Sequence, residues 1–198
     1  MPRITKSVEE RRQEIIDTAR LMFLETGFEN TQMADISKKM NVAAGTIFHY
    51  FKSKLELLYA VIDELTYEKA RSKSQFLNGI QGSAFDRLKM IFTSFEDELN
   101  EKMNVRFSDD PAIIQHYMAK LVGSFLPIFA SLIVQGNDDG SWSCEYPEEI
   151  AMFILQGFTG VMSLTRKHDD PIIEKKKRIK AIAKAIYRVL DIPEEKNQ

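Results

Sequence analysis

The sequence is poor in several residues whose scarcity restricts fold and chemistry. Only one of its 198 residues, Cys144, is a cysteine, so no disulfide can form within the chain, and we expect a reducing compartment such as the cytoplasm. Six prolines and nine glycines leave few breaks in long stretches of helical periodicity. These properties predict an all-α protein.

Long uninterrupted apolar runs are also missing. The two most apolar stretches, residues 125–134 and 150–164, are interrupted by Pro127 and Gln156. The first residues, up to Gln13, carry charges and no apolar segment typical of a signal peptide. We therefore expect neither a membrane span nor a signal peptide.

Histidine is scarce, which limits the metal and acid–base chemistry available. A di-metal site in a helical bundle uses Glu-x-x-His pairs, but the residues three positions before the three histidines are Thr46, Ile113 and Thr165. The chain also has no G-x-S-x-G sequence, P-loop or cysteine–histidine cluster. We expect no enzyme activity, no metal and no cofactor.

The charge is unevenly distributed, although its net value is only -2. Residues 1–54 contain nine Lys/Arg and seven Asp/Glu, whereas the rest of the chain contains 18 and 22. A mildly basic N-terminal part is thus followed by an acidic one. Of the two, only the N-terminal part suits a DNA-binding surface.

Three short helices are predicted in this N-terminal part. The first covers about residues 8–26 and ends at Gly27, where glycine allows a positive φ and Phe28 can fold back on the last turn. Either Asn30 or Thr31 can be the N-cap of the second helix. Asn41 can make the turn that follows, because asparagine tolerates a positive φ.

The third predicted helix, residues 43–51, has a composition unusual for a surface helix. Ile47 and Phe51 are four residues apart, so they share a side that we predict to be buried. Small, short polar and aromatic residues occupy the other side, which suits close approach to a major groove and contacts with base edges and phosphates. The alternative is that these are ordinary amphipathic helices in which His49 and Tyr50 are half-buried packing residues.

Phosphate contacts are predicted on both flanks of this helix, because free N–H groups at helix starts attract anions. One flank is Thr31 and the start of the second helix. The other is Lys54 at the start of a helix that Ser53 and Glu56 can cap as an S-x-x-E box. The predicted DNA-binding residues are Thr31, Gln32, Ala44, Gly45, Thr46, His49, Tyr50 and Lys54.

The run from Ile15 to Leu58 resembles the N-terminal domain of the TetR family of bacterial transcriptional repressors. The matching residues are Ile15, Ala19, Phe23, Gly27, Thr31, Ile36, Val42, Gly45, Thr46, Tyr50, Phe51, Lys54, Leu57 and Leu58. Ser37 and Asn41 depart from it, standing where many members have alanine and glycine. The resemblance implies a homodimer whose two DNA-binding domains enter successive major grooves of a pseudo-palindromic operator, and a helical body that binds a small inducer. The DNA-contact roles proposed for Thr31, Thr46, Tyr50 and Lys54 match those family positions.

We therefore predict two domains, residues 1–54 for DNA binding and residues 55–198 for effector binding and dimerisation. In the second domain, apolar periodicity predicts a helix over about residues 53–74 that includes Leu55, Leu58, Ile62 and Leu65. Later helices follow breaks at residues 81–83, 108–111, 137–140, 146–147 and 169–171. We expect Pro127 to kink or divide the helix that starts near Pro111.

The second domain is dense in aromatic residues and methionines, which permits two interpretations. They can simply pack a core, or some of them can line a pocket with a few polar groups. In the second case the walls predict a small hydrophobic or aromatic effector. The predicted ligand-binding residues are Phe92, Arg106, His116, Tyr117, Phe125 and Gln156.

The last two predicted helices can form half of a four-helix dimer seam. Gly157 and Gly160 would allow another helix to approach closely, and apolar residues repeat along the final helix. The alternative is a hairpin within one chain. The predicted interface residues are Gly157, Gly160, Ile179, Ile182 and Ile186.

Together with these patterns, the resemblance implies a repressor that binds double-stranded DNA and is released from it by a small effector. Half-sites one helical turn apart require a DNA-binding-domain spacing of roughly 34 to 36 Å, so a small swing of the helix over residues 53–74 would disrupt binding. The alternative is a DNA-binding regulator without a small-molecule inducer, either an activator or a protein controlled by a protein partner.

Overall fold

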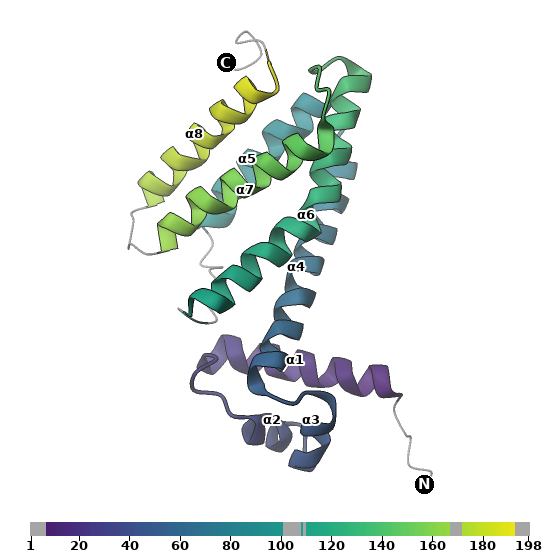
Figure 1. The fold of residues 1–198 in the computed structure, drawn as a ribbon, viewed down its shortest axis with the longest axis vertical. Coiled ribbons are helices and arrows are strands. Elements are labelled where there is room, and N and C mark those ends of the chain that lie inside the picture. The colour runs from purple at the N-terminus through teal and green to yellow at the C-terminus, as the bar shows by residue number, and fades with distance from the viewer. Residues whose placement is uncertain (1–6, 101–107, 109, 167–171, 193–198) are drawn as a thin grey trace. The chain divides into compact units, whose positions relative to one another are not determined.

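The computed structural model describes residues 7–100, 108, 110–166 and 172–192, and these form eight helices and no strand (Figure 1). The all-α prediction is therefore confirmed. In chain order the helices are α1 (Val8–Thr26), α2 (Met33–Lys39), α3 (Ala44–Tyr50), α4 (Lys54–Gly79), α5 (Ala84–Asn100), α6 (Pro111–Asp139), α7 (Pro147–Arg166) and α8 (Ile172–Val189).

Both ends of α1 are set by local side chains. Ser7 and Glu10 form a reciprocal capping box, in which the Glu10 N–H donates to Ser7 Oγ at 3.1 Å and the Ser7 N–H donates to the Glu10 carboxylate at 2.7 Å. The helix ends at Gly27, whose φ is 87°. Phe28 then packs edge-on against Phe23 with ring centroids 5.4 Å apart, as predicted.

The start of α2 differs from the prediction. Its N-cap is Gln32, whose backbone N–H donates to the Asp35 carboxylate at 2.9 Å. The predicted N-caps, Asn30 and Thr31, are wrong because their side chains turn back toward α1. The Thr31 hydroxyl donates to the Gly27 carbonyl at 2.8 Å, and the Asn30 amide donates to the Thr26 carbonyl at 3.0 Å.

The predicted capping box at the start of α4 forms in part. Ser53 Oγ accepts the Glu56 N–H at 3.0 Å, but the Glu56 carboxylate accepts the N–H of Lys52 rather than that of Ser53. The helix continues to Gly79, beyond the predicted end near residue 74. Leu55, which shares the predicted helical spacing with Leu58, Ile62 and Leu65, is exposed, while Leu57 is fully buried.

Helix α6 starts as predicted, with Pro111 at its first position and the Asp110 carboxylate accepting the Ala112 N–H at 2.7 Å. It continues through Pro127, so of the two expected outcomes, a kink or a division, the division is wrong. By length and composition alone α6 could cross a membrane. Buried residues along it, such as Phe129 and Leu132, instead belong to the core, and a core helix passes the same test.

The chain forms two compact units. The first contains residues 1–67 and 105–120, and the second contains residues 68–104 and 121–198. Helices α4 and α6 contribute residues to both units. The boundaries between these units do not fall at residue 54. The functional division after residue 54 stays a prediction.

The first unit has a core built from the inward sides of α1 to α4. Each of these helices places aliphatic or aromatic side chains there at helical spacing. The fully or nearly fully buried members are Ile15, Ile16, Ala19, Phe23, Ile36, Ile47, Phe51, Leu57, Leu58, Val61 and Ile62.

The second unit buries its core between the second half of α4 and helices α5, α6, α7 and α8, and α8 packs on both α5 and α7 (Figure 1). Trp142 packs closely against the C-terminal part of α6. The Trp142 indole lies so near Gly136 that a Cβ on that glycine would overlap the ring. The indole N–H donates to the Ile133 carbonyl at 2.9 Å in a buried bond. Only glycine is compatible with this packing.

Candidate functional site

The turn between α2 and α3 has the geometry that the sequence predicted. Asn41 has a φ of 53°, one of the two positive values among the described non-glycine residues. Its N–H donates to the Lys38 carbonyl at 3.1 Å, and the Val42 N–H donates to the Ser37 carbonyl at 3.0 Å. Asparagine therefore makes the left-handed turn at a position where glycine is common in the TetR family.

Helix α3 is held by its inward side and leaves its outward side open. Ile47 and the following Phe51 are buried in the first unit, as predicted. Ala44, Gly45 and His49 are exposed. A Cβ on Gly45 would meet nothing within 4 Å, so no packing within the chain requires a glycine there, and the position is free for close approach by another molecule.

The polar groups predicted for DNA contact lie on or beside this open side. His49 is exposed, and Thr46 and Tyr50 are half-buried. The His49 and Tyr50 rings meet edge-on with centroids 5.2 Å apart. Each ring thus restricts the other's orientation, which places two hydrogen-bonding groups at the C-terminal end of α3.

Phe48 is an outward residue that our sequence reasoning missed. Its side chain is 46% exposed, although it stands between buried Ile47 and exposed His49. Phe48 lies four positions after Ala44, so helical spacing alone could have placed it on the same side of the helix. An exposed ring on a groove-binding helix can make an apolar contact with a thymine methyl group.

Thr31 does not offer its hydroxyl to a phosphate in this structure. It is 1% exposed, and its hydroxyl is hydrogen-bonded to the Gly27 carbonyl and the Thr26 hydroxyl, both at 2.8 Å. Its side-chain phosphate role is therefore corrected to that of joining the end of α1 to the start of α2. Gln32, next to it, is exposed.

Lys54 has an intramolecular role besides its predicted phosphate contact. Its ammonium donates to the Phe28 carbonyl at 2.8 Å and to the Glu29 carbonyl at 3.3 Å, and it lies 4.4 Å from the centre of the Phe28 ring. It thus joins the first turn of α4 to the segment before α2. An ammonium has three donors, so these two bonds leave one for another group.

The described residues among those predicted to bind a ligand are divided between the two units. His116 and Tyr117 lie in the first unit, whereas Phe92, Phe125 and Gln156 lie in the second. Phe92, Tyr117 and Phe125 are buried, and Gln156 is exposed. Arg106 lies outside the described residues. Phe92 and Phe125 lie in the core of the second unit, which agrees with the interpretation that these residues simply pack a core.

His116 instead belongs to a contact between α4 and α6 inside the first unit. Its ring stacks on Tyr59 at a centroid distance of 4.0 Å, and its Nε2 lies 3.0 Å from the Asp63 carboxylate. The other oxygen of Asp63 accepts from Lys120 at 2.8 Å. These four side chains join α4 and α6 within the parts of both helices that belong to the first unit.

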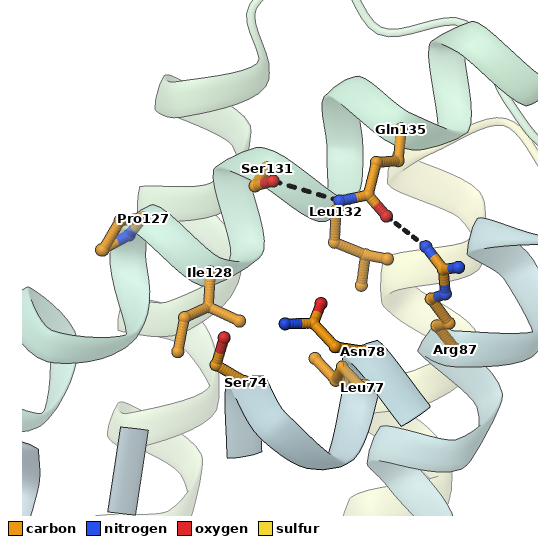
Figure 2. Close-up of a pocket in the computed structure, with 9 residues that line it drawn as sticks. All are labelled: Ser74, Leu77, Asn78, Arg87, Pro127, Ile128, Ser131, Leu132 and Gln135. Carbon is orange, nitrogen blue, oxygen red and sulfur yellow. Dashed lines mark hydrogen bonds between the residues drawn. The ribbon is translucent and has the colours of Figure 1, made fainter. Parts of the chain in front are cut away.

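The second unit contains a cavity of about 290 Å³ whose lining residues the sequence did not predict (Figure 2). Helices α4, α5 and α6 supply its walls. The nine lining residues are Ser74, Leu77, Asn78, Arg87, Pro127, Ile128, Ser131, Leu132 and Gln135. None of the five predicted ligand-binding residues that the structure describes is among them.

One side of the cavity is a chain of polar groups. Gln135 donates from its amide nitrogen to Ser131 Oγ at 3.1 Å, and its amide oxygen accepts from the Arg87 guanidinium. Figure 2 shows Gln135 between Ser131 and Arg87, with the Asn78 amide on the facing helix. Leu77, Ile128 and Leu132 supply apolar surface.

The predicted dimer-interface residues divide into two groups. Gly157 and Gly160 are exposed on α7, and a Cβ on either would meet nothing within 4 Å. Ile179 and Ile186 are buried in the core of their own chain, so they cannot form an exposed seam, and Ile182 is half-buried. Helical periodicity identified an apolar side of α8 correctly but not what covers it.

No group of three potential metal ligands occurs among the residues that the structure describes. The one free cysteine, Cys144, is half-buried. Its N–H donates to the Asn137 side chain at 2.8 Å, and its carbonyl accepts from the same side chain at 2.8 Å. Its backbone thus helps to shape the loop between α6 and α7.

Comparison with known sequences finds a family model described as bacterial regulatory proteins, tetR family, which matches residues 15–61. The chain is 26% identical over 185 residues to the uncharacterized HTH-type transcriptional regulator YfiR of Bacillus subtilis (strain 168), covering 85% of this chain and 87% of that protein. It is 25% identical over 160 residues to the HTH-type transcriptional repressor KstR2 of Rhodococcus jostii (strain RHA1), covering 74% of each.

Solved structures share the fold. RolR in complex with resorcinol superposes with a TM-score of 0.67 at 18% identity, covering 93% of this chain and 89% of that one. The R. erythropolis transcriptional repressor QsdR superposes with a TM-score of 0.68 at 16% identity, covering 94% and 97%. At these identities the likeness extends to the fold alone.

Proposed function

We propose that this chain, which belongs to the TetR family of bacterial transcriptional regulators, is a homodimeric cytoplasmic repressor that a small molecule releases from DNA. The observation that carries the proposal is the outward side of α3. Buried Ile47 and Phe51 anchor this short helix, while Gly45 has open space around it and His49 is exposed. A helix anchored in this way can enter a major groove without losing its own packing.

We further propose that two chains associate through α7. Met152 and Phe153 are exposed there, the latter by 65%, beside Gly157 and Gly160. Large apolar side chains next to glycines on one helix face suit close packing against a second helix. A second copy of this chain is the proposed occupant, because a two-fold dimer matches a pseudo-palindromic operator with two half-sites.

The proposed effector site is the cavity of the second unit. Ser74, Leu77 and Asn78 on α4 line it, and the same helix carries Lys54 beside the DNA-binding segment. An effector that binds one arrangement of α4 better than another would shift the population of the two. The apolar part of the cavity supports an effector with a hydrophobic or aromatic body.

The test starts from DNA. Purified chain would select duplexes from a random-sequence pool, and the affinity for the selected duplex would be measured across salt concentrations. We expect a slope of log K against log salt of about -0.9 for each phosphate neutralised. A flat plot, or no enrichment of any duplex, would contradict operator binding.

The oligomeric state needs a separate measurement. Light scattering should give a dimer for the unmodified chain and a monomer for Phe153→Glu, because a carboxylate in an apolar interface is costly to desolvate. Met90→Glu, at an exposed apolar position on α5, is the matched control and should stay dimeric. A monomeric unmodified chain at micromolar concentration would overturn the proposed assembly.

A further inference from the structure

We infer that the cavity between α4, α5 and α6 binds a small monocarboxylate, whose carboxylate pairs with Arg87. This inference rests on the proposed function and specifies its effector: an acid head joined to a short apolar body. The proposal follows from the charge of the cavity wall, the bonds already made by the guanidinium, and the size of the space.

Arg87 brings a positive charge to the cavity that no lining residue balances. It is the one charged residue among the nine that line the space. Among the residues that the structure describes, no carboxylate forms an ion pair with it within 4.0 Å. A half-buried guanidinium beside a cavity favours an anion, because charges attract more strongly where less water screens them.

The carboxylate of Asp139, on which the charge of Arg87 acts, is already hydrogen-bonded elsewhere. It accepts the Ala84 N–H at 2.6 Å and the Ser141 N–H at 3.0 Å. Burial raises the pKa of Asp139, but hydrogen bonds from Ser141 and Ala84 outweigh this effect and lower it. The charge of Arg87 contributes least to the lowering. Asp139 therefore serves mainly to cap the start of α5 and leaves Arg87 available to a ligand.

The guanidinium has donors left over and is held in place. One terminal nitrogen donates to the Gln135 amide oxygen, and Nε lies 3.5 Å from the Ile80 carbonyl, at the limit of a hydrogen bond. A guanidinium has five N–H donors in a planar fork that matches the two oxygens of a carboxylate. Gln135, itself bonded to Ser131, restricts the orientation of that fork.

The rest of the wall limits what else the ligand can contain. The volume, about 290 Å³, is at the small end of ligand sites, which begin near 300 Å³. Leu77, Ile128 and Leu132 supply an apolar surface on one side, and the Asn78 amide lies across from Gln135 (Figure 2). A branched chain or a single ring attached to the acid would cover the apolar side.

Benzoate and 4-methylpentanoate are suitable probes, each paired with its neutral primary amide, and inorganic phosphate tests for a general anion site. Each would be added at about 10 mM to the full-length chain, and melting temperature and calorimetric affinity would be measured. We expect at least one acid to stabilise the chain and to bind at least about tenfold more tightly than its amide. Amides that bind as well as the acids, stabilisation by phosphate alone, or no response to either acid would overturn the inference.

Variants of the wall separate the guanidinium from a general charge effect. Arg87→Gln should weaken acid binding by at least about tenfold, whereas Lys89→Gln, which removes the same charge from an exposed position of α5, should not change it. Gln135→Glu nearly preserves shape but supplies Arg87 with an internal carboxylate, so it should abolish acid binding even if Arg87→Gln fails to fold. Unchanged acid affinity in Gln135→Glu would contradict the proposed pairing.

The same variants distinguish this inference from the proposed function. Ligand-free Arg87→Gln should keep the operator affinity of the unmodified chain but lose release by the acid. Acid binding without release from DNA would support the ligand class and overturn the effector role of the cavity. Release from DNA by a neutral amide as effective as its acid would support regulation and overturn the carboxylate.

Discussion

The two compact units use opposite routes to a functional surface. In the first, the predicted DNA-binding side is built from consecutive residues, and short-range features orient it: the turn at Asn41, the anchor Ile47 and the cap Ser53. In the second, the cavity takes residues from positions 74 to 135 on three helices. Local structure thus determines the predicted DNA-binding surface, whereas packing between distant segments determines the cavity.

The largest expected effect tests the anchoring of α3. Ile47→Ala removes a fully buried side chain and should destabilise the first unit by about 2–5 kcal/mol. Hydrogen exchange should show lost amide protection in α1 to α3 and unchanged protection in α8. Equal loss in both units would show that they unfold together and would remove the energetic basis of the comparison.

The corresponding change in the second unit is Gly136→Ala. The new methyl group would overlap the Trp142 ring, and overpacking of this kind typically costs about 1–3 kcal/mol. Protection should fall in α5 to α8, and Trp142 fluorescence should shift as the buried indole moves. Gly123→Ala, at an exposed position of α6 in the same unit where a Cβ would meet nothing within 4 Å, serves as the control and should leave both signals unchanged.

A smaller effect, on binding rather than stability, is expected from Phe48→Ala. This exposed ring contributes little to the core, so the melting temperature should stay within about a degree while operator affinity falls by about 1 kcal/mol. Ile47→Ala, at the neighbouring buried position, should show the opposite pattern, because it should lower stability before it changes operator affinity. An unchanged affinity for every selected duplex would remove Phe48 from the contact surface.

The smallest expected effect is on the stability of the chain at acidic pH. Burial raises the pKa of Asp139, but hydrogen bonds from Ser141 and from the Ala84 N–H outweigh it and hold the pKa below its ordinary value. A lowered pKa stabilises the folded chain above the unfolded pKa of about 3.9, and this contribution is lost as pH falls through the folded value. Below about pH 4, the melting temperature of Asp139→Asn should therefore decrease less steeply than that of the unmodified chain. Parallel curves would exclude a contribution from this carboxylate.

Prediction from the sequence was most successful where the decisive neighbours are close in the chain. The turn at Asn41, the end of α1 at Gly27 with Phe28 folded back, and the start of α6 at Pro111 each depend on a few consecutive residues. Their conformations follow from backbone preferences and capping bonds. The outward side of α3 could be predicted for the same reason.

Errors occurred where a distant segment decides the environment. Ile179 and Ile186 were expected at a dimer seam, but they are buried in the core of their own unit, where α8 packs on α5 and α7. Helical periodicity correctly placed these two residues on one apolar side of α8, but the side chains that cover this side come from other helices.

The sequence by itself determined that the chain is helical, where most helices begin and end, and which short segment has a DNA-binding composition. Only the tertiary structure decided that Ile179 and Ile186 are buried in their own chain and that Arg87 and Gln135 meet beside a cavity. The physical reason is that helical periodicity specifies which residues share a side, while the identity of what covers that side depends on packing between helices.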